Sequence, residues 1–453
     1  MIKEIRDKQR EYFKRGNTLD YSFRIMQLKK LKNMVIEYEQ EFINALKEDL
    51  DKSEFEAIAS ELYMVLEEIN MFLKNLKKWM KIRKVKKNLL TIDAKTTVIS
   101  KPYGVSLIIS PWNYPLQLTL LPVVGAIGGG NTIIIAPSQL TPKFYDVLRK
   151  AINSTFDEEY CTVIDKSIMP EETTKIEYDK IFFTGSPRVG KLIMESASKY
   201  LTSVTLELGG KSPVIVNDTK NMKRAIKRIL WGKFLNSGQT CISPDYLLVK
   251  ETLKEEFLKI FKSEIEIYKK ERRLNKIVNQ NHYNRLKSYL SGGNIIYGGE
   301  CDDENISIET TLIEPFNIDV ALMQEEIFGP IFPIIYYNSK EDARDIIERI
   351  CNRPLAMYIF STDEEFISYF LDSIHFGGAS VNDTITHILN PNAPFGGVAN
   401  SGIGQYHGFD SFKSFSKDTT VLRKGYGFEI NVKYPPYDKH LKGLKGLYNK
   451  LKK

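Results

Sequence analysis

The stretch Gly104-Val105-Ser106-Leu107-Ile108-Ile109-Ser110 begins a regular alternation of strand-like and helix-like segments. A short apolar run between a glycine and a polar turn is typical of a strand that is buried on both faces. Residues 116–127 predict a helix that ends at three glycines, and residues 132–135 predict the next strand. Further strands are predicted at 161–164, 180–183 and 204–206. This alternation predicts an α/β fold in which helices cover both faces of a parallel sheet.

The alternation continues toward the C-terminus, and helices precede it. Apolar residues recur at three- and four-residue spacing within residues 1–86, which predicts helices. Residues 89–100 are rich in Thr, Val and Ile and predict a strand or hairpin arm. We expect further helices at 222–234, 252–268 and 280–290, strands at 295–297 and 331–337, and a closing strand at 421–432. The glycine-containing segments 376–382 and 394–397 are interpreted as functional loops.

Two turns in the first half of the chain are candidates for ligand binding at the edge of the predicted sheet. Open parallel sheets bind ligands beside the carboxyl ends of strands, next to helix N-termini. Pro111-Trp112-Asn113-Tyr114-Pro115 and Thr184-Gly185-Ser186-Pro187-Arg188-Val189-Gly190 each follow a predicted strand. The second turn has free N–H groups for a phosphate, but the G-x-G-x-x-G spacing occurs nowhere in the chain. Taken alone, Gly185-Ser186 is equally consistent with an ordinary helix cap.

A cysteine lies in a tight turn between a predicted helix and a predicted strand. The turn is Asn236-Ser237-Gly238-Gln239-Thr240-Cys241-Ile242-Ser243-Pro244, and strand-like residues 246–249 follow it. A thiolate beside backbone N–H groups can attack a carbonyl, and those groups stabilise the oxyanion that forms. Most free cysteines are small, buried apolar residues. The turn alone therefore does not distinguish a nucleophile from a core residue.

Composition places the chain among soluble globular proteins. Its 453 residues are 42% apolar and 27% charged, and no apolar run reaches the ~18–20 residues of a membrane span. The N-terminus has no apolar signal segment and the four cysteines are widely spaced, so we expect a cytoplasmic protein without a metal centre. Residues 431–453 hold seven lysines and one aspartate, which is +6 of the net charge of +7. The rest of the chain has no basic footprint for nucleic acid.

Six stretches together resemble the aldehyde dehydrogenase superfamily, and they occur in the family's order. They are Pro111-Trp112-Asn113-Tyr114-Pro115, Phe182-Phe183-Thr184-Gly185-Ser186, Leu206-Glu207-Leu208-Gly209-Gly210-Lys211-Ser212-Pro213, Gly238-Gln239-Thr240-Cys241, Glu325-Glu326-Ile327-Phe328-Gly329-Pro330 and Pro394-Phe395-Gly396-Gly397. The compact length and Cys241-Ile242-Ser243-Pro244-Asp245-Tyr246 resemble the class 3 branch. One such stretch is weak evidence, whereas six in order indicate the family.

The resemblance implies roles for individual residues. Cys241 would be the nucleophile on the aldehyde carbon, and Asn113 would hold the oxyanion together with the Cys241 backbone N–H. Glu207 would activate the water that hydrolyses the thioester. The alternative reading of Glu207 is a surface acid, but an exposed Glu rarely lies in a Leu-Glu-Leu-Gly-Gly run. The implied cofactor-binding residues are Trp112, Ser138, Gly185, Ser186, Gly190, Leu208, Glu326 and Phe328, of which Phe328 could equally be a core residue.

The chain departs from the family pattern at the expected adenosine site. Family members usually carry Lys-Pro-Ser-Glu where this chain has Ala136-Pro137-Ser138-Gln139. The cation and the anion that contact the adenosine ribose are therefore both missing. We expect NAD or NADP as cofactor, with a slight preference for NAD. Ala399 and Phe409 also stand where Gly and Lys are common, and neither touches the expected chemistry.

The resemblance also implies two doubly wound α/β domains and a small β oligomerisation arm. We expect a dinucleotide-binding domain at 1–87 and 104–207, a catalytic domain at 208–420, an arm at 88–103 and 421–432, and a basic amphipathic tail at 433–453. The arm implies a homodimer. For the tail, whose leucines recur at helix spacing, we favour packing on protein over weak contact with an anionic membrane.

The expected function is NAD(P)-dependent oxidation of an aldehyde to its carboxylic acid through a thiohemiacetal and a thioester on Cys241. Two alternatives stay open. A catalytically silent binding or structural protein with the same fold is favoured only by Ala136 and Gln139. A dehydrogenase that transfers the acyl group to coenzyme A is opposed by Glu207, because a placed hydrolytic base favours water. The sequence does not identify the aldehyde.

Overall fold

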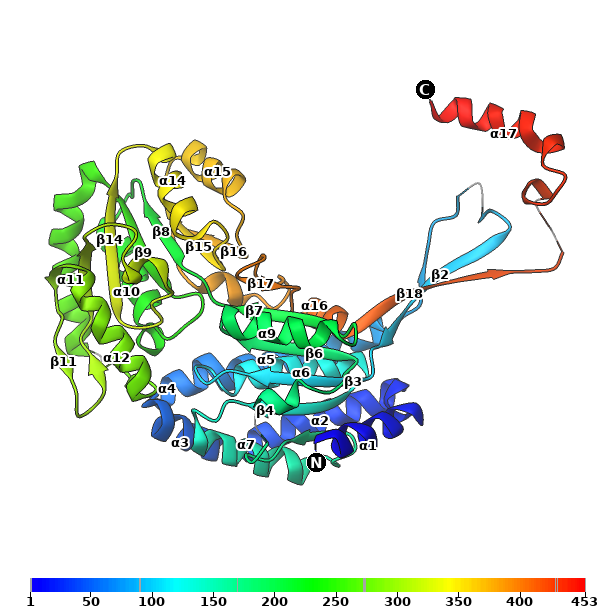
Figure 1. Cartoon of the computed structure of the whole chain (residues 1–453), viewed down its shortest axis with the longest axis horizontal. Helices are drawn as coiled ribbons and strands as arrows, with labels where there is room; N and C mark the ends of the chain where they lie inside the picture. Colours follow the sequence, from blue (N-terminus) through cyan, green and yellow to red (C-terminus); the bar gives the residue numbers. More distant parts are fainter. Residues whose placement is uncertain are drawn as a thin grey trace. The chain divides into compact units, whose positions relative to one another are not determined.

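The computed structural model describes residues 2–88, 91–168, 170–271, 274–427, 429 and 431–452. The chain forms two compact units. The first consists of Met1–Trp79 and Pro102–Ser416, and the second of Met80–Lys101 and Lys417–Lys453. Two sheets of mainly parallel strands, each with flanking helices, make up the first unit (Figure 1). The expected α/β fold class is confirmed.

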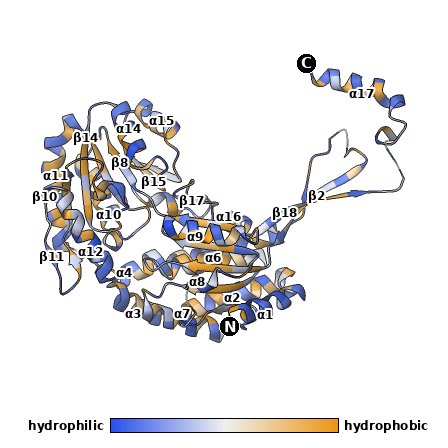
Figure 2. Cartoon of the chain, viewed as in Figure 1, coloured by the Kyte–Doolittle hydropathy of each residue, from blue (hydrophilic) through white to orange (hydrophobic). Residues whose placement is uncertain are grey.

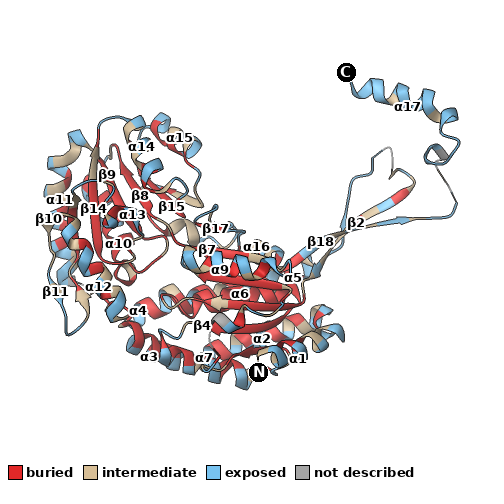
Figure 3. Ribbon diagram, in the orientation of Figure 1, coloured by how far each residue is buried: buried red, intermediate tan, exposed pale blue. Residues whose placement is uncertain are grey.

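The first sheet has its strands in the order β17-β7-β6-β3-β4-β5. The bounds are β17 Gly402–Ile403, β7 Ser203–Leu208, β6 Lys180–Gly185, β3 Val105–Ser110, β4 Thr132–Pro137 and β5 Cys161–Val163. The pairs from β7 to β5 are parallel, and β17 alone runs antiparallel to its neighbour. Every residue of β4 is buried, as expected for a strand with helices on both faces (Figure 3).

Helices pack on both sides of this sheet. The helix α6 is apolar all round, and all of its residues are buried, so it packs against β3 and β4 as a core helix (Figure 2). On the opposite side, Ile193 and Ala197 of α9 join Val105 and Leu107 of β3 in one apolar cluster. The helices of this half are α1 Ile2–Lys14, α2 Tyr21–Glu37, α3 Glu39–Leu50, α4 Glu54–Ala57, α5 Tyr63–Trp79, α6 Gln117–Gly129, α7 Pro142–Thr155, α8 Pro170–Thr173, α9 Pro187–Ser198 and α16 Gly408–Ser414.

The second sheet has the strand order β10-β13-β14-β9-β8-β15-β16. Its strands are β10 Gly293–Tyr297, β13 Thr311–Pro315, β14 Ile331–Tyr337, β9 Pro244–Lys250, β8 Ser212–Val216, β15 Ala356–Phe360 and β16 Gly378–Val381. Its helices are α10 Met222–Phe234, α11 Lys254–Glu271, α12 Gln280–Tyr289, α13 Ala321–Gln324, α14 Lys340–Cys351 and α15 Glu364–Ser373. A short hairpin of β11 Cys301–Asp302 and β12 Ser307–Ile308 lies outside the sheet.

One short strand links the C-terminal part of the chain to the first sheet. Gly402 of β17 pairs with Glu207 of β7, and α16 packs against α6. Residues beyond 400 therefore contribute to the first sheet, although they lie in the range 208–420 that we assign to the catalytic domain. The domain division itself stays a prediction.

The second unit contains a three-stranded sheet and a C-terminal helix. The strands β1 Arg83–Lys84, β2 Ala94–Pro102 and β18 Ser416–Lys424 lie in that order. The expected closing strand at 421–432 begins earlier, at Ser416, and residues 428 and 430 of that range are outside the described residues, as are 89 and 90 of the arm. The tail forms α17 Asp438–Leu451, in which Leu441, Leu444 and Leu451 are exposed. Across the described residues, we find no helix with the length and apolarity to cross a membrane.

Candidate active site

The Cys241 turn has an unusual backbone. The helix α10 ends at Phe234, and Asn236, Ser237 and Gly238 then adopt left-handed conformations with φ of 51°, 55° and 76°. Glycine is needed at 238 because a Cβ there would collide with the carbonyl oxygen of Gly329. A left-handed serine is uncommon and is held here by its hydroxyl, which donates to the Asn275 carbonyl at 2.8 Å. This turn places Cys241 three residues before the start of β9.

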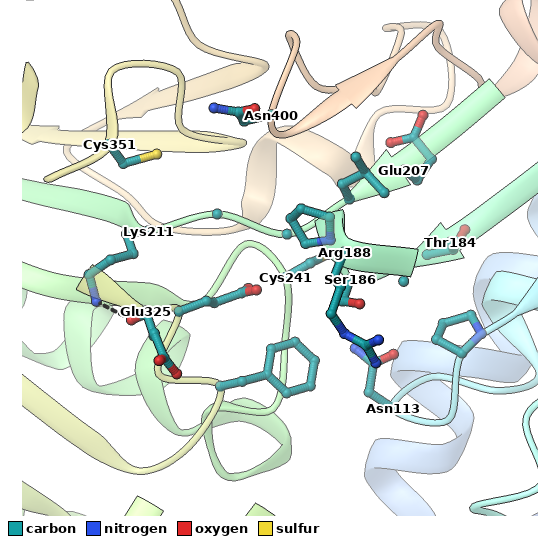
Figure 4. A pocket seen from close by; sticks show the side chains of 18 of the residues that line it. Asn113, Thr184, Ser186, Arg188, Glu207, Lys211, Cys241, Glu325, Cys351 and Asn400 are labelled. Atoms are coloured by element: carbon teal, nitrogen blue, oxygen red, sulfur yellow. Dashed lines mark hydrogen bonds between the residues drawn. The ribbon is translucent and has the colours of Figure 1, made fainter. Parts of the chain in front are cut away.

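Cys241 lies where two cavities meet. A cleft of about 780 Å³ is lined by Cys241 together with Asn113, Glu207, Glu326 and Phe328 (Figure 4). A second cavity of about 250 Å³, here called the tunnel, is also lined by Cys241. Most of the tunnel wall is apolar, with Phe55, Met64, Trp231, Leu235, Ile385, Ile388, Leu389 and Phe395. The thiol therefore has access to a large cleft that carries charged side chains and to a smaller, apolar space.

Asn113 is pinned beside the Cys241 turn. Its Nδ2 donates to the Gln239 carbonyl at 3.1 Å, which leaves the second amide hydrogen for another acceptor. Its own carbonyl accepts from Asn236 Nδ2 at 3.0 Å and from Lys52 Nζ at 2.8 Å. The loop after β3 and the loop after α10 are thereby fixed to each other. Asn113 is 3% exposed, and it lines the cleft.

A fully buried ion pair supports this arrangement. Lys52 and Glu61 have side chains with 0% exposure, and Lys52 Nζ lies 2.5 Å from Glu61 Oε1. Glu61 Oε2 accepts from the backbone N–H groups of Leu116 and Gln117 at 2.8 and 3.0 Å, where α6 begins. One pair thus fixes both the start of α6 and the carbonyl of Asn113. The sequence offers no signal for this role, because lysines and glutamates are mostly surface residues.

Glu207 is a buried carboxyl at the edge of the cleft. It lies on β7 and is 3% exposed, and neither carboxyl oxygen has a hydrogen-bond partner among the described residues. Burial raises the pKa of Glu207 well above the ordinary carboxyl value. A carboxyl without a partner, in contact with a cleft, can accept a proton from water if it ionises.

Three side chains form hydrogen bonds with the backbone of the loop that carries Glu326 and Phe328. Arg285 donates to the carbonyls of Glu326 and Ile327 at 2.9 and 2.8 Å. Lys211 donates to the Glu325 carbonyl at 2.7 Å (Figure 4) and is paired with Asp245, whose Oδ2 accepts from the Ile327 N–H. Burial, and then the charge of Asp245, raise the pKa of Glu326 to about 8. A Cβ at Gly209 would collide with the Glu326 carboxyl, so this glycine gives the side chain its space.

The surroundings of Cys241 disfavour ionisation of its thiol. Burial raises its pKa to about 12, and the charges of Glu326 and Glu207 add to this effect. The backbone N–H groups of Cys241 and Ile242 act in the opposite direction, but they are weaker. The turn therefore supplies oxyanion donors without forming a thiolate in advance.

The cleft fits a nicotinamide dinucleotide. Gly185 and Ser186 line it at the N-terminus of α9, where Ser186 Oγ caps the helix by accepting from the Val189 N–H at 3.4 Å. Arg188 adds a cation at the same place, which suits a pyrophosphate. Trp112 and Phe328 meet edge to face with ring centroids 5.4 Å apart, and they provide an aromatic wall beside Cys241. Leu208 also lines the cleft.

Two of the expected cofactor contacts lie outside the lining of this cleft. Gly190 is buried in α9, and a Cβ there would lie 2.7 Å from Leu208 Cδ2, so this glycine lets α9 approach β7 closely. Ser138 lies at the end of β4, where its Oγ accepts from the Leu140 N–H at 3.2 Å. Nearby Gln139 is exposed and donates to the Lys166 carbonyl. Within the described residues, no cluster of three or more His, Cys, Asp or Glu side chains is placed to hold a metal ion.

Breaking the buried ion pair should destabilise the protein strongly. We expect Lys52→Met to lower the free energy of unfolding by about 3–5 kcal/mol, because Glu61 would be left as an unpaired buried charge. The double variant Lys52→Met/Glu61→Gln should show a smaller decrease in the free energy of unfolding. Urea unfolding monitored by circular dichroism measures the change. Lys150→Met is the matched control, since Lys150 forms an exposed pair with Glu41 worth about 0–1 kcal/mol. Equal losses at the two lysines would contradict this account.

Alkylation of Cys241 should depend steeply on pH. In the cofactor-free protein, the rate of reaction with iodoacetamide should rise about tenfold per pH unit from pH 7 to 10, because a thiol with a raised pKa forms little thiolate. Peptide mass spectrometry at Cys241 follows the reaction. N-acetylcysteine, whose thiol ionises near pH ~8.5, is the control and should level off earlier. A plateau at neutral pH for Cys241 would show that the thiol is already ionised.

Comparison with known proteins agrees with this geometry. The model of the aldehyde dehydrogenase family matches residues 1–421. The chain is 42% identical to the 4,4'-diaponeurosporen-aldehyde dehydrogenase of Staphylococcus aureus over 96% of this chain and 97% of that protein. It is 40% identical to aldehyde dehydrogenase family 3 member A2 of Pongo abelii over 94% of this chain and 90% of that protein.

A solved structure shows the same fold and supports the same assignment. The substrate-bound state of Staphylococcus aureus AldH superposes with a TM-score of 0.94 at 42% identity and covers 99% of both chains. The cleft, the tunnel and the half-buried Cys241 thus occur on a fold and a sequence shared with aldehyde dehydrogenases. The chain belongs to the aldehyde dehydrogenase family and is an NAD(P)-dependent aldehyde dehydrogenase.

Proposed function

We propose that this enzyme oxidises uncharged, apolar aldehydes to carboxylic acids through a thioester on Cys241. The observation that carries the proposal is the position of Cys241 between the cleft and the apolar tunnel. An aldehyde held in the tunnel has its carbonyl carbon near the thiol, while the cleft holds the dinucleotide. Both reactants thus reach the same sulfur from opposite sides.

The first step needs an oxyanion site, and Asn113 can provide it. When Sγ of Cys241 bonds to the aldehyde carbon, the thiol proton passes to solvent water in the cleft, the C=O π bond breaks and the carbonyl oxygen becomes negative. The free Nδ2 hydrogen of Asn113 and the backbone N–H of Cys241 can donate to that oxygen. One such donor is typically worth about 2.7–4 kcal/mol of transition-state stabilisation. Nicotinamide, when bound in the cleft, supplies the hydride acceptor.

Hydrolysis of the thioester is assigned to Glu207. Once ionised, its unpartnered carboxylate can take a proton from water that attacks the acyl carbon, and the carboxylic acid then leaves as the thiol reforms. The raised pKa makes Glu207 a stronger base but leaves it protonated at lower pH, so this step should accelerate as the pH rises. A base in this position favours water over coenzyme A as acyl acceptor. The complete site also disfavours a catalytically silent protein.

The cofactor preference is proposed to be weak, with NAD slightly favoured over NADP. Ala136 and Gln139 place neither a carboxylate, which would repel a 2′-phosphate, nor a cation, which would attract one, at the end of β4. The nearby Lys166 amine is 2.6 Å from Asp146, and this ion pair weakens the attraction of Lys166 for a 2′-phosphate. For Glu326 we propose contact with the nicotinamide ribose, and for Trp112 and Phe328 contact with the ring.

We also propose a cellular location, an oligomeric state and a packing mode for the C-terminal helix. A cytoplasmic location is supported by four free cysteines. A homodimer is supported by β18, an edge strand whose outer N–H and C=O groups can pair with a second copy. For α17, we still favour packing of its exposed leucines on protein over contact with a membrane.

An aldehyde panel tests the substrate and the roles of the residues. Straight-chain aldehydes of two to ten carbons are assayed with NAD and with NADP. For the wild type, kcat/KM should rise about fourfold per methylene until the tunnel is full, since each buried CH₂ contributes ~0.8 kcal/mol. Asn113→Ala should lower kcat about 10²- to 10³-fold. A flat dependence on chain length would contradict the apolar tunnel as the substrate site.

The same panel separates hydrolysis from the earlier steps. In Glu207→Gln, we expect a first-turnover burst of NADH followed by slow steady-state turnover, because the thioester forms but hydrolyses slowly. Glu195→Gln removes an exposed carboxylate on α9 and is the matched control, with kinetics like the wild type. Wild-type steady-state turnover in Glu207→Gln, or acyl-CoA as the product when coenzyme A is present, would overturn the role of Glu207.

A further inference from the structure

The tunnel wall contains a side-chain amide that neither the fold nor the proposed reaction uses. Gln117 is the first residue of α6, is 7% exposed and lines the tunnel together with Cys241. Its backbone N–H donates to the buried Glu61 Oε2 at 3.0 Å, which fixes the position of the residue. Its side-chain amide has no hydrogen-bond partner among the residues that the structure describes. The amide is therefore available to a molecule in the tunnel.

Several other polar groups of the same wall are hydrogen-bonded within the protein. Tyr114 Oη and Thr240 Oγ1 lie 2.8 Å apart, so these two hydroxyl groups satisfy each other. Ser60 Oγ donates to the Glu56 carbonyl at 2.6 Å. Such bonds account for the presence of these side chains in the wall. Gln117 differs from them, because burying an amide without a partner costs free energy that the fold does not recover.

The surroundings of Gln117 suit a polar but uncharged group. The amide carries no charge, so it cannot replace the hydration that an ion loses on entering an apolar space. Burial keeps Tyr406 and His407 of the same wall neutral, because it raises the pKa of the phenol well above its ordinary value and lowers the pKa of the imidazole to about 4. The carboxylate of the wall, on Glu56, accepts a hydrogen bond from the Asn236 N–H and supports the Cys241 turn.

A hydroxyl group meets this requirement in either orientation of the amide. It can donate to Oε1 of Gln117 or accept from Nε2, whereas an ether or carbonyl oxygen can only accept. A methyl group in the same place would leave the buried amide unpaired. The rest of the chain would still meet an apolar wall that includes Trp231, Leu235 and Ile388.

We propose that Gln117 is a specificity-determining residue that binds a hydroxyl group on the chain of an otherwise apolar aldehyde. This inference rests on the proposed use of the tunnel by the aldehyde and adds one polar position to that substrate. The aldehyde carbon lies at Cys241, and the hydroxyl elsewhere on the same chain pairs with the Gln117 amide. The hydroxyl takes no part in the oxidation, so the chemistry at Cys241 is unchanged.

The test compares two series of straight-chain aldehydes that differ by one heavy atom. Aldehydes of six to ten carbons with a terminal hydroxyl are each paired with the aldehyde in which a methyl group replaces that hydroxyl. For the wild type, the ratio of kcat/KM for the hydroxyl compound to that for the methyl compound should pass through a maximum at the chain length whose hydroxyl reaches Gln117. In Gln117→Leu, the ratio at that length should fall about tenfold, because one buried hydrogen bond is lost.

Gln40→Leu is the matched control for this variant. It makes the same change at an exposed position on α3 and should keep the wild-type ratio at every chain length.

The outcomes distinguish this inference from the proposed function. If the wild type oxidises the methyl series but the ratio has no maximum, or if Gln117→Leu keeps the maximum, the inference is overturned and the proposed function stands. If the wild type oxidises neither series, both fail. The wild-type series tests the inference by itself, in case Gln117→Leu does not fold. A ratio that stays constant with chain length would show that the amide does not bind the substrate.

Discussion

The whole site depends on one constraint, which is that a single sulfur atom must be reached from two cavities. The left-handed backbone at residues 236–238 meets it by turning the chain sharply between α10 and β9. The left-handed backbone conformation costs free energy at Asn236 and Ser237. The turn keeps this conformation because contacts from other segments stabilise it. The Asn113 side chain donates a hydrogen bond to the Gln239 carbonyl in this turn, and Lys52 Nζ donates one to the backbone carbonyl of Asn113. The buried Lys52–Glu61 pair therefore acts on the nucleophile indirectly, through a chain of hydrogen bonds.

Burial sets the electrostatics of this sulfur. It raises the pKa of the Cys241 thiol, with a smaller contribution from Glu326 and Glu207, and it also raises the pKa of both of these carboxyls. The raised pKa values therefore favour the protonated forms of the thiol and of both carboxyls over a preformed thiolate. A protonated thiol is protected from oxidation and alkylation, which suits an enzyme whose thiol faces an open cleft. Ionisation of the thiol then belongs to the assembled reaction rather than to the resting protein.

Local pattern predicted much of the fold. Helix α10 begins and ends where periodicity places it, because Asn221 caps its start and the backbone leaves the helix at Leu235. The buried strands β3, β4 and β6 are short apolar runs, and they too match. What could not be predicted is non-local. Residues 378–381 form the edge strand β16 within a segment interpreted as a loop, and the pairing of Gly402 with Glu207 joins segments far apart in the chain.

In the site, too, the residues with a local sequence motif could be predicted, and those placed by non-local contacts could not. Cys241, Asn113 and Glu207 could be proposed from their motifs, and all three line one cleft. The residues that hold and tune them, such as Lys52, Glu61 and Arg285, could not, because a lysine or glutamate buried by tertiary contacts reads locally as a surface residue.

The most direct test of the central claim is to trap the covalent intermediate and find the atom that carries it. Glu207→Gln enzyme is mixed with excess apolar aldehyde and NAD, quenched in acid within one turnover, and analysed by intact-mass and peptide mass spectrometry. The account predicts a mass increase equal to one acyl group, located on Cys241 and absent when NAD is omitted. An acyl group on another residue, or NADH formed without any covalent adduct, would contradict it.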